Sequence, residues 1–137
     1  MVNKTVRSIM RSTNICLDPK MSLDLVSDHL TKNQLPGAPV IDSNKNPVGF
    51  VSEYDCLEQL MQSTYYCDNT ALAEDVMSTK LISTSPDLSL MDVASQMNES
   101  KVNVAPVLEN GKIIGVISRS DIMRELVIEL HECKIPV

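Results

Sequence analysis

Residues 102–118 read VNVAPVLENGKIIGVIS, two apolar runs that are separated by the dipeptide Asn110-Gly111. An Asn-Gly pair between apolar runs is the strongest short-range signal for a β-hairpin, because both residues tolerate positive φ angles. Residues 35–52 read LPGAPVIDSNKNPVGFVS and show the same two apolar runs around a longer turn without an Asn-Gly pair. We therefore expect two related antiparallel hairpins in this chain.

The repetition extends well beyond the hairpins, at an offset of about 67 residues that becomes about 66 after the hairpin turn. In the first copy the recurring residues are Met10, Pro19, Ser22, Leu23, Val26, Ala38, Pro39, Val40, Gly49, Ser52, Asp55 and Leu60. Their counterparts are Met77, Pro86, Ser89, Leu90, Val93, Ala105, Pro106, Val107, Gly115, Ser118, Asp121 and Leu126. A long repeat present only twice indicates two similar lobes that share a core, since about 60 residues alone are marginally stable. Clefts between such lobes are natural ligand sites.

Each copy predicts the order strand, helix, strand, strand, helix. In the second copy we expect a strand at 81–86, a helix at 89–100, the hairpin and a helix at 121–132, from apolar spacing and a capping box. The matching segments of the first copy are 15–19, 22–32, 38–42, 47–52 and 53–62, with short helices expected around 5–10 and 73–77. The expected organisation is a first repeat at 1–64, a polar linker at 65–72 and a second repeat at 73–137, which together form one compact module.

Composition indicates an ordinary globular domain with 43% hydrophobic and 22% charged residues. The formal net charge of −6, with no run of Lys or Arg, argues against a nucleic-acid partner. The N-terminal residues lack an apolar signal core and no aliphatic stretch is long enough to span a membrane, so a cytoplasmic location without membrane contact is expected. Four dispersed cysteines and two isolated histidines favour free thiols over disulfides or a metal site.

The order of elements, the two Ala-Pro-Val triplets and the sequences GFVSEYD (49–55) and GVISRSD (115–121) resemble the CBS domain, named after cystathionine beta-synthase. The resemblance runs from about Val6 to Glu132, and two such domains in tandem form a Bateman module. It implies an α+β or α/β fold of two pseudo-symmetric β-α-β-β-α repeats that pack through their small sheets. It also implies two clefts for adenosine-containing ligands, a homodimer of four repeats, regulation of a separate partner protein and no catalysis.

Ser118 and Asp121 have two alternative roles at the expected strand-to-helix junction. The free N–H groups and positive dipole end of the helix can receive a phosphate, and an ionised Asp can accept hydrogen bonds from both ribose hydroxyls. Gly115 would let the backbone approach a ligand closely. The alternative is structural, because Ser-x-x-Asp at a helix start is also a capping box. The two roles can coexist, and Ser52 and Asp55 repeat them in the first copy.

By resemblance, the preferred second cleft would consist of Ser78, Leu81, Ser83, Val102, Asn103, Val104, Ser118, Arg119, Ser120 and Asp121. The weaker first cleft would consist of Arg11, Asn14, Cys16, Leu35, Pro36, Gly37, Ser52 and Asp55. Arg119 and Ser120 can donate to an anion, whereas Glu53 at the matching position repels one, so tighter binding is expected beside Asp121. Val102 and Val104 are equally well explained as core residues.

Few basic residues flank these motifs, which favours AMP over ADP or ATP, with S-adenosylmethionine as a further candidate and no required cofactor. The leading hypothesis is a regulatory sensor that binds such a ligand and signals to a separate, unidentified partner. The alternative is a structural dimerisation module with empty clefts. Enzymatic activity is not expected, because the chain has no P-loop, GxSxG or HExxH motif.

Overall fold

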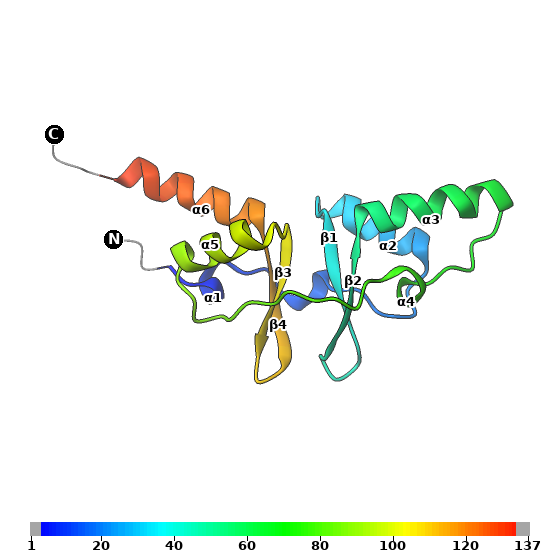
Figure 1. The fold of residues 1–137 in the computed structure, drawn as a ribbon, viewed down its shortest axis with the longest axis horizontal. Coiled ribbons are helices and arrows are strands. Elements are labelled where there is room, and N and C mark those ends of the chain that lie inside the picture. The colour runs from blue at the N-terminus through cyan, green and yellow to red at the C-terminus, as the bar shows by residue number, and fades with distance from the viewer. Residues whose placement is uncertain (1–3, 134–137) are drawn as a thin grey trace.

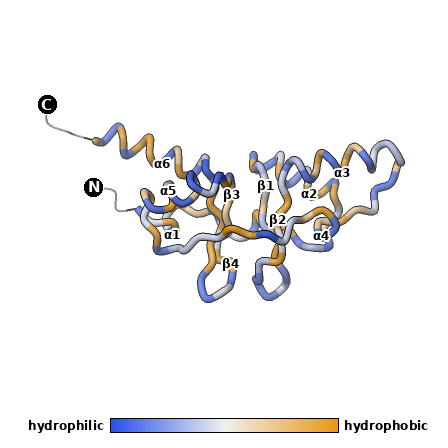
Figure 2. Tube along the Cα trace, in the orientation of Figure 1, coloured by the Kyte–Doolittle hydropathy of each residue, from blue (hydrophilic) through white to orange (hydrophobic). Residues whose placement is uncertain are grey.

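The computed structural model describes residues 4–133 and forms both predicted hairpins (Figure 1). Strands β1 (Gly37–Ile41) and β2 (Pro47–Ser52) pair in antiparallel fashion, as do β3 (Val104–Glu109) and β4 (Lys112–Ser118). Asn110 and Gly111 adopt φ angles of 54° and 78° in the second turn, the conformation for which this dipeptide is favoured. Figure 2 shows apolar strands at the centre of the molecule and hydrophilic hairpin turns.

Two long helices accompany each hairpin. They are α2 (Leu23–Lys32) and α3 (Glu53–Tyr66) with the first hairpin, and α5 (Leu90–Ser100) and α6 (Arg119–Glu132) with the second. Three short turns of helix complete the set: α1 (Val6–Ile9), η1 (Thr13–Ile15) and α4 (Ala73–Val76). The α3 helix extends further than its apolar spacing predicts, so that residues 65–66, expected in the linker, are helical. No helix within residues 4–133 has the length and apolar character of a membrane span.

The predicted first strand of each copy is reduced to a single parallel bridge, Leu17 beside Val40 in β1 and Thr84 beside Val107 in β3. Leu17 donates its N–H to the Pro39 carbonyl, and Ile41 donates to the Leu17 carbonyl, at 2.8 and 2.9 Å. The next bonds of this parallel ladder would need N–H groups from Pro19 and Pro39, which proline lacks. Pro86 and Pro106 limit the second bridge in the same way.

The two sequence copies exchange their opening segments in space. Val6 is fully buried in the apolar cluster of the second hairpin, and its N–H donates to the Leu88 carbonyl at 3.0 Å. Conversely, Ala73 is fully buried in the cluster of the first hairpin and its N–H donates to the Met21 carbonyl at 2.8 Å. Figure 1 accordingly shows α1 beside α5 and α4 beneath α3. We call residues 15–66 with 71–78 the first lobe, and residues 4–12 with 82–132 the second lobe.

The recurring glycines make room for this exchange. Met10 and Arg11 cross strand β4, and a Cβ atom on Gly115 would lie 2.8 Å from the Arg11 carbonyl oxygen and would also collide with the Met10 sulfur. Gly49 in β2 accommodates Met77 and Ser78 in the same way, with the Ser78 carbonyl oxygen 3.0 Å from the position of a Cβ. The expectation that Gly115 faces a ligand is therefore wrong, because the crossing backbone of the opposite copy occupies that side.

The lobes pack through their hairpins, as the resemblance implies. Val104 of β3 and Val116 of β4 belong to the apolar cluster that otherwise consists of first-lobe residues. The Lys45 carbonyl of the first turn accepts a hydrogen bond of 2.9 Å from the Ile113 N–H. Each sheet therefore covers apolar surface of the other, and the space between the lobes is bounded by strands of both.

Candidate functional site

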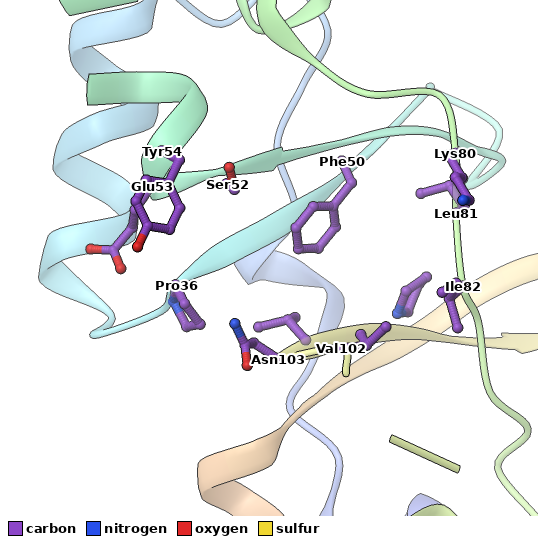
Figure 3. A pocket seen from close by; sticks show the side chains of 12 residues that line it. Pro36, Phe50, Ser52, Glu53, Tyr54, Lys80, Leu81, Ile82, Val102 and Asn103 are labelled. Carbon is purple, nitrogen blue, oxygen red and sulfur yellow. The ribbon is translucent and has the colours of Figure 1, made fainter. Parts of the chain in front are cut away.

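A cavity of about 230 Å³ lies between the two lobes (Figure 3). It is lined by Pro36, Phe50, Ser52, Glu53, Tyr54, Lys80, Leu81, Ile82, Val102, Asn103, Val104 and Pro106. The volume is somewhat below the range of about 300–1,000 Å³ that is typical of ligand pockets, so part of a nucleotide-sized ligand would extend into the open mouth. Apolar walls with a few polar groups are the usual composition of such a site.

The first lobe supplies one wall through the junction of β2 and α3. Ser52 is the N-cap of α3, and Glu53 donates its N–H to the Pro36 carbonyl at 2.9 Å. The Phe50 ring points toward the cavity in Figure 3, and it lies against Gly37, where a Cβ atom would be 2.6 Å from the ring. The backbone before β1 and the start of α3 are thereby held together at the edge of the cavity.

The second lobe and the segment that leads into it supply the opposite wall. Ser78 exchanges backbone hydrogen bonds of 2.8 Å with Phe50, which directs the following residues 80–82 across the cavity. The Ser78 hydroxyl accepts from the Lys80 N–H at 3.2 Å and fixes the turn there. Val102 and Val104 approach from the start of β3. The cavity therefore exists only because the two copies exchange segments.

The polar groups of the cavity are few and of mixed charge. Glu53 and Lys80 provide one negative and one positive side chain, and Ser52 provides a hydroxyl. The α3 N-terminus has less free donor capacity than expected, because the Glu53 N–H donates to Pro36 and the Asp55 N–H donates to the Ser52 hydroxyl at 3.1 Å. This leaves the first turn suited to one small anionic group rather than to several.

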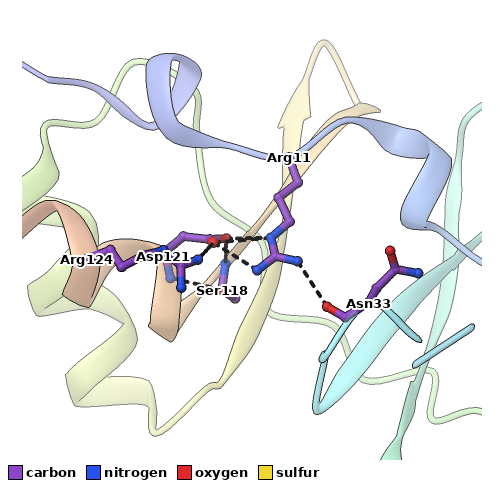
Figure 4. A network of polar contacts seen from close by, with 5 residues as sticks. All are labelled: Arg11, Asn33, Ser118, Asp121 and Arg124. Carbon is purple, nitrogen blue, oxygen red and sulfur yellow. Dashed lines mark hydrogen bonds and ion pairs between the residues drawn. The ribbon is translucent and has the colours of Figure 1, made fainter. Parts of the chain in front are cut away.

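Asp121, expected to be the ribose acceptor of the preferred cleft, is held by two arginines (Figure 4). The Arg11 Nε donates to both carboxylate oxygens at 3.2 and 3.1 Å, and its Nη2 donates to Oδ1 at 3.0 Å. The Arg124 Nη2 donates to the same Oδ1 at 2.7 Å. Arg11 Nη1 also donates to the Asn33 carbonyl of the first lobe at 3.3 Å, so this cluster connects the two lobes.

The electrostatics of Asp121 follow from this setting. Its side chain is only 9% exposed and that of Arg11 is 28% exposed, so both charges are partly shielded from water. Burial alone would raise the Asp121 pKa, but hydrogen bonds from Arg11 and Ser118, together with the positive charge of Arg11, lower this pKa below its ordinary value. Asp121 is therefore an ionised partner in a salt bridge, and a ribose would have to compete with Arg11 for it.

Both Ser-x-x-Asp motifs form the capping box. Asp121 accepts from the Ser118 N–H at 3.0 Å and Asp55 accepts from the Ser52 N–H at 2.9 Å, each with the reciprocal bond to the serine hydroxyl. Asp55 does not line the cavity. It faces a separate polar recess of about 170 Å³ that includes Asp75 and Glu58.

The structure groups the predicted site residues differently from the sequence. The cavity combines Pro36 and Ser52 of the expected first cleft with Leu81, Val102, Asn103 and Val104 of the expected second cleft. Ser118 and Asp121 lie at the Arg11 cluster instead, and Asn103 is bound to their helix through its carbonyl, which accepts from the Arg119 N–H at 2.8 Å. Each expected cleft consists of residues from a single copy. The observed cavity contains residues from both copies, because the opening segments are exchanged.

The remaining predicted residues have structural surroundings. Leu35 is a core residue with 2% exposure, Ser83 accepts at its carbonyl from the Gln96 side chain, and Asn14 accepts from the Ser12 hydroxyl. Burial raises the pKa of the Cys16 thiol to about 11. Arg119 and Ser120 face grooves on the outer surface of α6.

The predicted clefts lack six of the residues that line the cavity, namely Phe50, Glu53, Tyr54, Lys80, Ile82 and Pro106. Phe50 is the only phenylalanine of the chain, and an aromatic ring between two repeated motif residues is a signal that could have been used. Lys80 and Ile82 have no such signal, because their position depends on the Ser78–Phe50 pairing between the two copies.

Comparison with known proteins gives a consistent assignment. The CBS domain model matches residues 6–62 and 73–128. The chain is 27% identical over 126 residues to the uncharacterized protein MJ1225 of Methanocaldococcus jannaschii, covering 91% of this chain and 44% of that one. It is 33% identical over 132 residues to the chloroplastic CBS domain-containing protein CBSX2 of Arabidopsis thaliana, covering 77% of this chain and 56% of that one. The chain thus spans about half the length of these two relatives.

Solved structures share the fold over nearly the whole chain. CBSX2 in complex with AMP has a TM-score of 0.76 and 27% identity, and covers 93% of this chain and 99% of that one. A putative acetoin utilization protein (AcuB) from Vibrio cholerae has a TM-score of 0.82 at 24% identity, with 97% and 98% covered. The CBS domain pair of MJ0100 in complex with 5′-methylthioadenosine and S-adenosyl-L-methionine has a TM-score of 0.77 at 21% identity, with 94% and 99% covered.

Two matches to the domain model in one chain, each containing one hairpin and its two long helices, agree with the duplicated fold. This protein belongs to the CBS domain family, as a tandem CBS pair.

Proposed function

We propose that this CBS pair is a regulatory module that binds an adenosine-containing ligand, AMP foremost, in the cavity beside Ser52 and signals its presence to a separate partner protein. The observation that carries the proposal is the cavity itself, which has apolar walls, one hydroxyl and one cationic side chain between two lobes. The structure of CBSX2 with AMP, at 27% identity, supports the ligand class. The proposal assigns no catalytic step to this chain.

The chemistry of the walls supports a nucleoside monophosphate. The Phe50 ring and the Val102 side chain offer apolar surface to a flat base, since aromatic rings stack favourably on π-systems. Lys80 is the one basic side chain among the described residues that line the cavity, and Glu53 is a nearby negative charge. One cation suits a single phosphate better than three, so AMP is favoured over ADP and ATP. S-adenosylmethionine, which carries no phosphate, is a further candidate.

The sequence and the structure favour different places for the principal ligand site. Sequence alone favours the cleft at Asp121, whereas the geometry favours the Ser52 cavity, because Arg11 already uses the Asp121 carboxylate. In our proposal the Ser52 cavity is the principal site. Ligand occupancy there would alter the angle between the lobes, since both lobes contribute walls.

Calorimetric titration of AMP tests the proposal with a matched pair of variants. Leu81→Asp puts a carboxylate into the cavity and is expected to weaken AMP binding at least about tenfold, the factor that corresponds to about 1.4 kcal/mol. Asn14→Asp makes the same charge change at the equivalent, exposed position of the other copy and is expected to leave the affinity within about twofold. Competition with ATP and S-adenosylmethionine ranks the ligands. Loss of binding in Asn14→Asp alone would refute the cavity as the site.

The second candidate function is a dimerisation module, favoured by exposed apolar side chains on the long helices. Leu57 and Met61 on α3 and Met123 and Val127 on α6 are all exposed. A homodimer would cover them, and it belongs to the first proposal as well. Light scattering after size-exclusion chromatography tests self-association, and dimerisation without any response to AMP would favour the second candidate.

A further inference from the structure

The repeat places a second space between the lobes, equivalent to the Ser52 cavity. In the Ser52 cavity the start of α3 faces residues 102–104, where β3 of the other lobe begins. The equivalent elements are the start of α6 after Ser118 and residues 35–37, where β1 begins. We call the space between these two elements the Asp121 cleft. Each space is thus bounded by a helix start and a strand start from opposite lobes.

The Arg11 side chain spans the Asp121 cleft (Figure 4). It leaves the backbone at the bridge between Arg11 and Val116, and its guanidinium donates to the Asp121 carboxylate at 3.0 to 3.2 Å. Its Nη1 reaches the first lobe and donates to the Asn33 carbonyl at 3.3 Å, in the turn that leads to residues 35–37. One side chain therefore contacts both lobes across the cleft, as a bound ligand would.

The guanidinium is held in the cleft by shielded, charge-assisted hydrogen bonds. The Asp121 side chain is almost completely buried and that of Arg11 is mostly buried. The Asp121 carboxylate is itself fixed by the Ser118 N–H in the capping box. Such bonds are strong, and burial protects them from screening by salt. A ribose would displace Arg11 only by leaving its partly buried charge without this partner, which is unfavourable.

The equivalent position beside the Ser52 cavity carries a much smaller side chain. Ser78 pairs with Phe50 as Arg11 pairs with Val116. Its hydroxyl accepts a local hydrogen bond of 3.2 Å from the Lys80 N–H, and the space next to it is the cavity of about 230 Å³. The two spaces therefore differ in whether a side chain from the crossing segment fills them.

We propose that the Arg11 side chain is a built-in occupant of the Asp121 cleft and restricts this CBS pair to one adenosine-ligand site per chain. The proposal rests on the ligand class of the proposed function, and it adds the number of sites and the residue that sets this number. It also explains why the motif at Asp121 is intact although the carboxylate is already bound. Arg11 thus determines the stoichiometry of ligand binding.

Exchange of the two matched residues tests the proposal by calorimetric titration of AMP. The wild type is expected to bind one AMP per chain. Arg11→Ser gives the Asp121 cleft the residue of the other copy and is expected to bind two AMP per chain, with the affinity of the original site within about twofold. Ser78→Arg puts a guanidinium beside the Ser52 cavity, where Asp55 repeats Asp121, and is expected to weaken AMP binding at least about tenfold.

A second pair of variants locates the gained site. Asn14 is the counterpart of Leu81 in the repeat. In the Arg11→Ser background, Asn14→Asp is expected to remove the gained site and keep the original one, whereas Leu81→Asp is expected to do the reverse. Each added carboxylate therefore acts on one of the two spaces. Circular dichroism melting confirms that the variants fold.

Two AMP per wild-type chain, or no gain of a site in Arg11→Ser, would overturn the proposal. A gained site that survives Asn14→Asp would do so as well. Unchanged AMP affinity in Ser78→Arg is a further contrary outcome, and it tests the proposal even where Arg11→Ser does not fold. Failure of the proposed function is a separate result: a wild type that does not bind AMP would refute the Ser52 cavity, while the gain of one site in Arg11→Ser would still support the role of Arg11.

Discussion

The first turns of α3 and α6 have the same capping box but different surroundings. In α3 the Ser52 cap opens onto a cavity of about 230 Å³, and within residues 4–133 no Lys or Arg side chain forms an ion pair with Asp55. In α6 the Asp121 carboxylate accepts hydrogen bonds from Arg11 and Arg124. The same local motif therefore borders an accessible cavity in one lobe and connects the lobes in the other. Motif identity alone does not determine which role a copy takes.

One matched pair of residues accounts for much of this difference. Arg11 and Ser78 occupy equivalent places: Arg11 pairs with Val116 in β4, and Ser78 pairs with Phe50 in β2. An arginine side chain is long enough to cross from that backbone to Asp121 and to the Asn33 carbonyl. A serine at the equivalent place accepts only a local hydrogen bond, from the Lys80 N–H. The Arg11 side chain therefore occupies the space between the lobes beside Asp121, whereas the shorter Ser78 side chain leaves the equivalent space open.

The largest expected difference between the two motifs is in stability. Asp121→Ala removes the acceptor of the Ser118 N–H in the capping box and the carboxylate that pairs with partly buried Arg11, which together should cost about 2–4 kcal/mol of unfolding free energy. Asp55→Ala removes only the capping-box acceptor of the Ser52 N–H and should cost about 1 kcal/mol. Urea denaturation of both variants measures the difference. Equal losses would show that the Arg11 cluster adds no stability and that the two motifs are energetically alike.

Replacing Arg11 should have a smaller effect. Arg11→Ser leaves Asp121 with Arg124 as a partner and should cost about 1–2 kcal/mol, the usual value of a charge-assisted hydrogen-bond pair. Because Arg11 does not line the cavity, AMP affinity should stay within about twofold. Thermal melting and calorimetric titration test the two statements, with Ser78→Ala as the control in the other copy. A large loss of AMP affinity would place Arg11 in the binding site and contradict the distinction between the clefts.

The smallest expected effect concerns pH. The folded pKa of Asp121 is lowered relative to an unfolded aspartate, so its stabilising contribution is present above about pH 4 and is lost as the pH falls through the lower folded value. The difference in unfolding free energy between wild type and Asp121→Asn should therefore be constant from about pH 5 to 7 and should shrink below about pH 4. A constant difference down to about pH 2 would mean that Arg11 does not hold the charged form.

Sequence reasoning could predict the parts of this fold that depend on local patterns. Asn110-Gly111 specifies a tight turn, and the caps at Ser52 and Ser118 follow from their spacing to an aspartate. The two predicted opening strands are shorter than expected, because Pro39 and Pro106 lie in the strands beside them and cannot donate hydrogen bonds. The loss of these hydrogen bonds depends on which strands lie side by side, and the spacing of apolar residues does not predict strand order.

The composition of the site could be predicted only in part, for a physical reason. Ser52, Leu81 and Val102, which the sequence predicts as ligand contacts of two different clefts, line one cavity in the structure. The two copies have similar apolar patterns, so the local sequence does not indicate that Val6 packs in the second lobe and Ala73 in the first. The position of Lys80 in the cavity and the contact between Arg11 and Asp121 both depend on that exchange. The spacing of motifs along the sequence therefore does not predict them.

The exchange of opening segments has a consequence during synthesis of the chain. The first lobe needs Ala73 and Ser78 to complete its core and sheet edge, so it stays incomplete on the ribosome until the second copy has begun to emerge. Val6 is synthesised before its partner Leu88 and strand β4, so its place in the second lobe is completed only later. A ribosome that pauses between the copies would therefore hold a first lobe without Ala73 and Ser78, and the two lobes complete their folding together only after both copies have been synthesised.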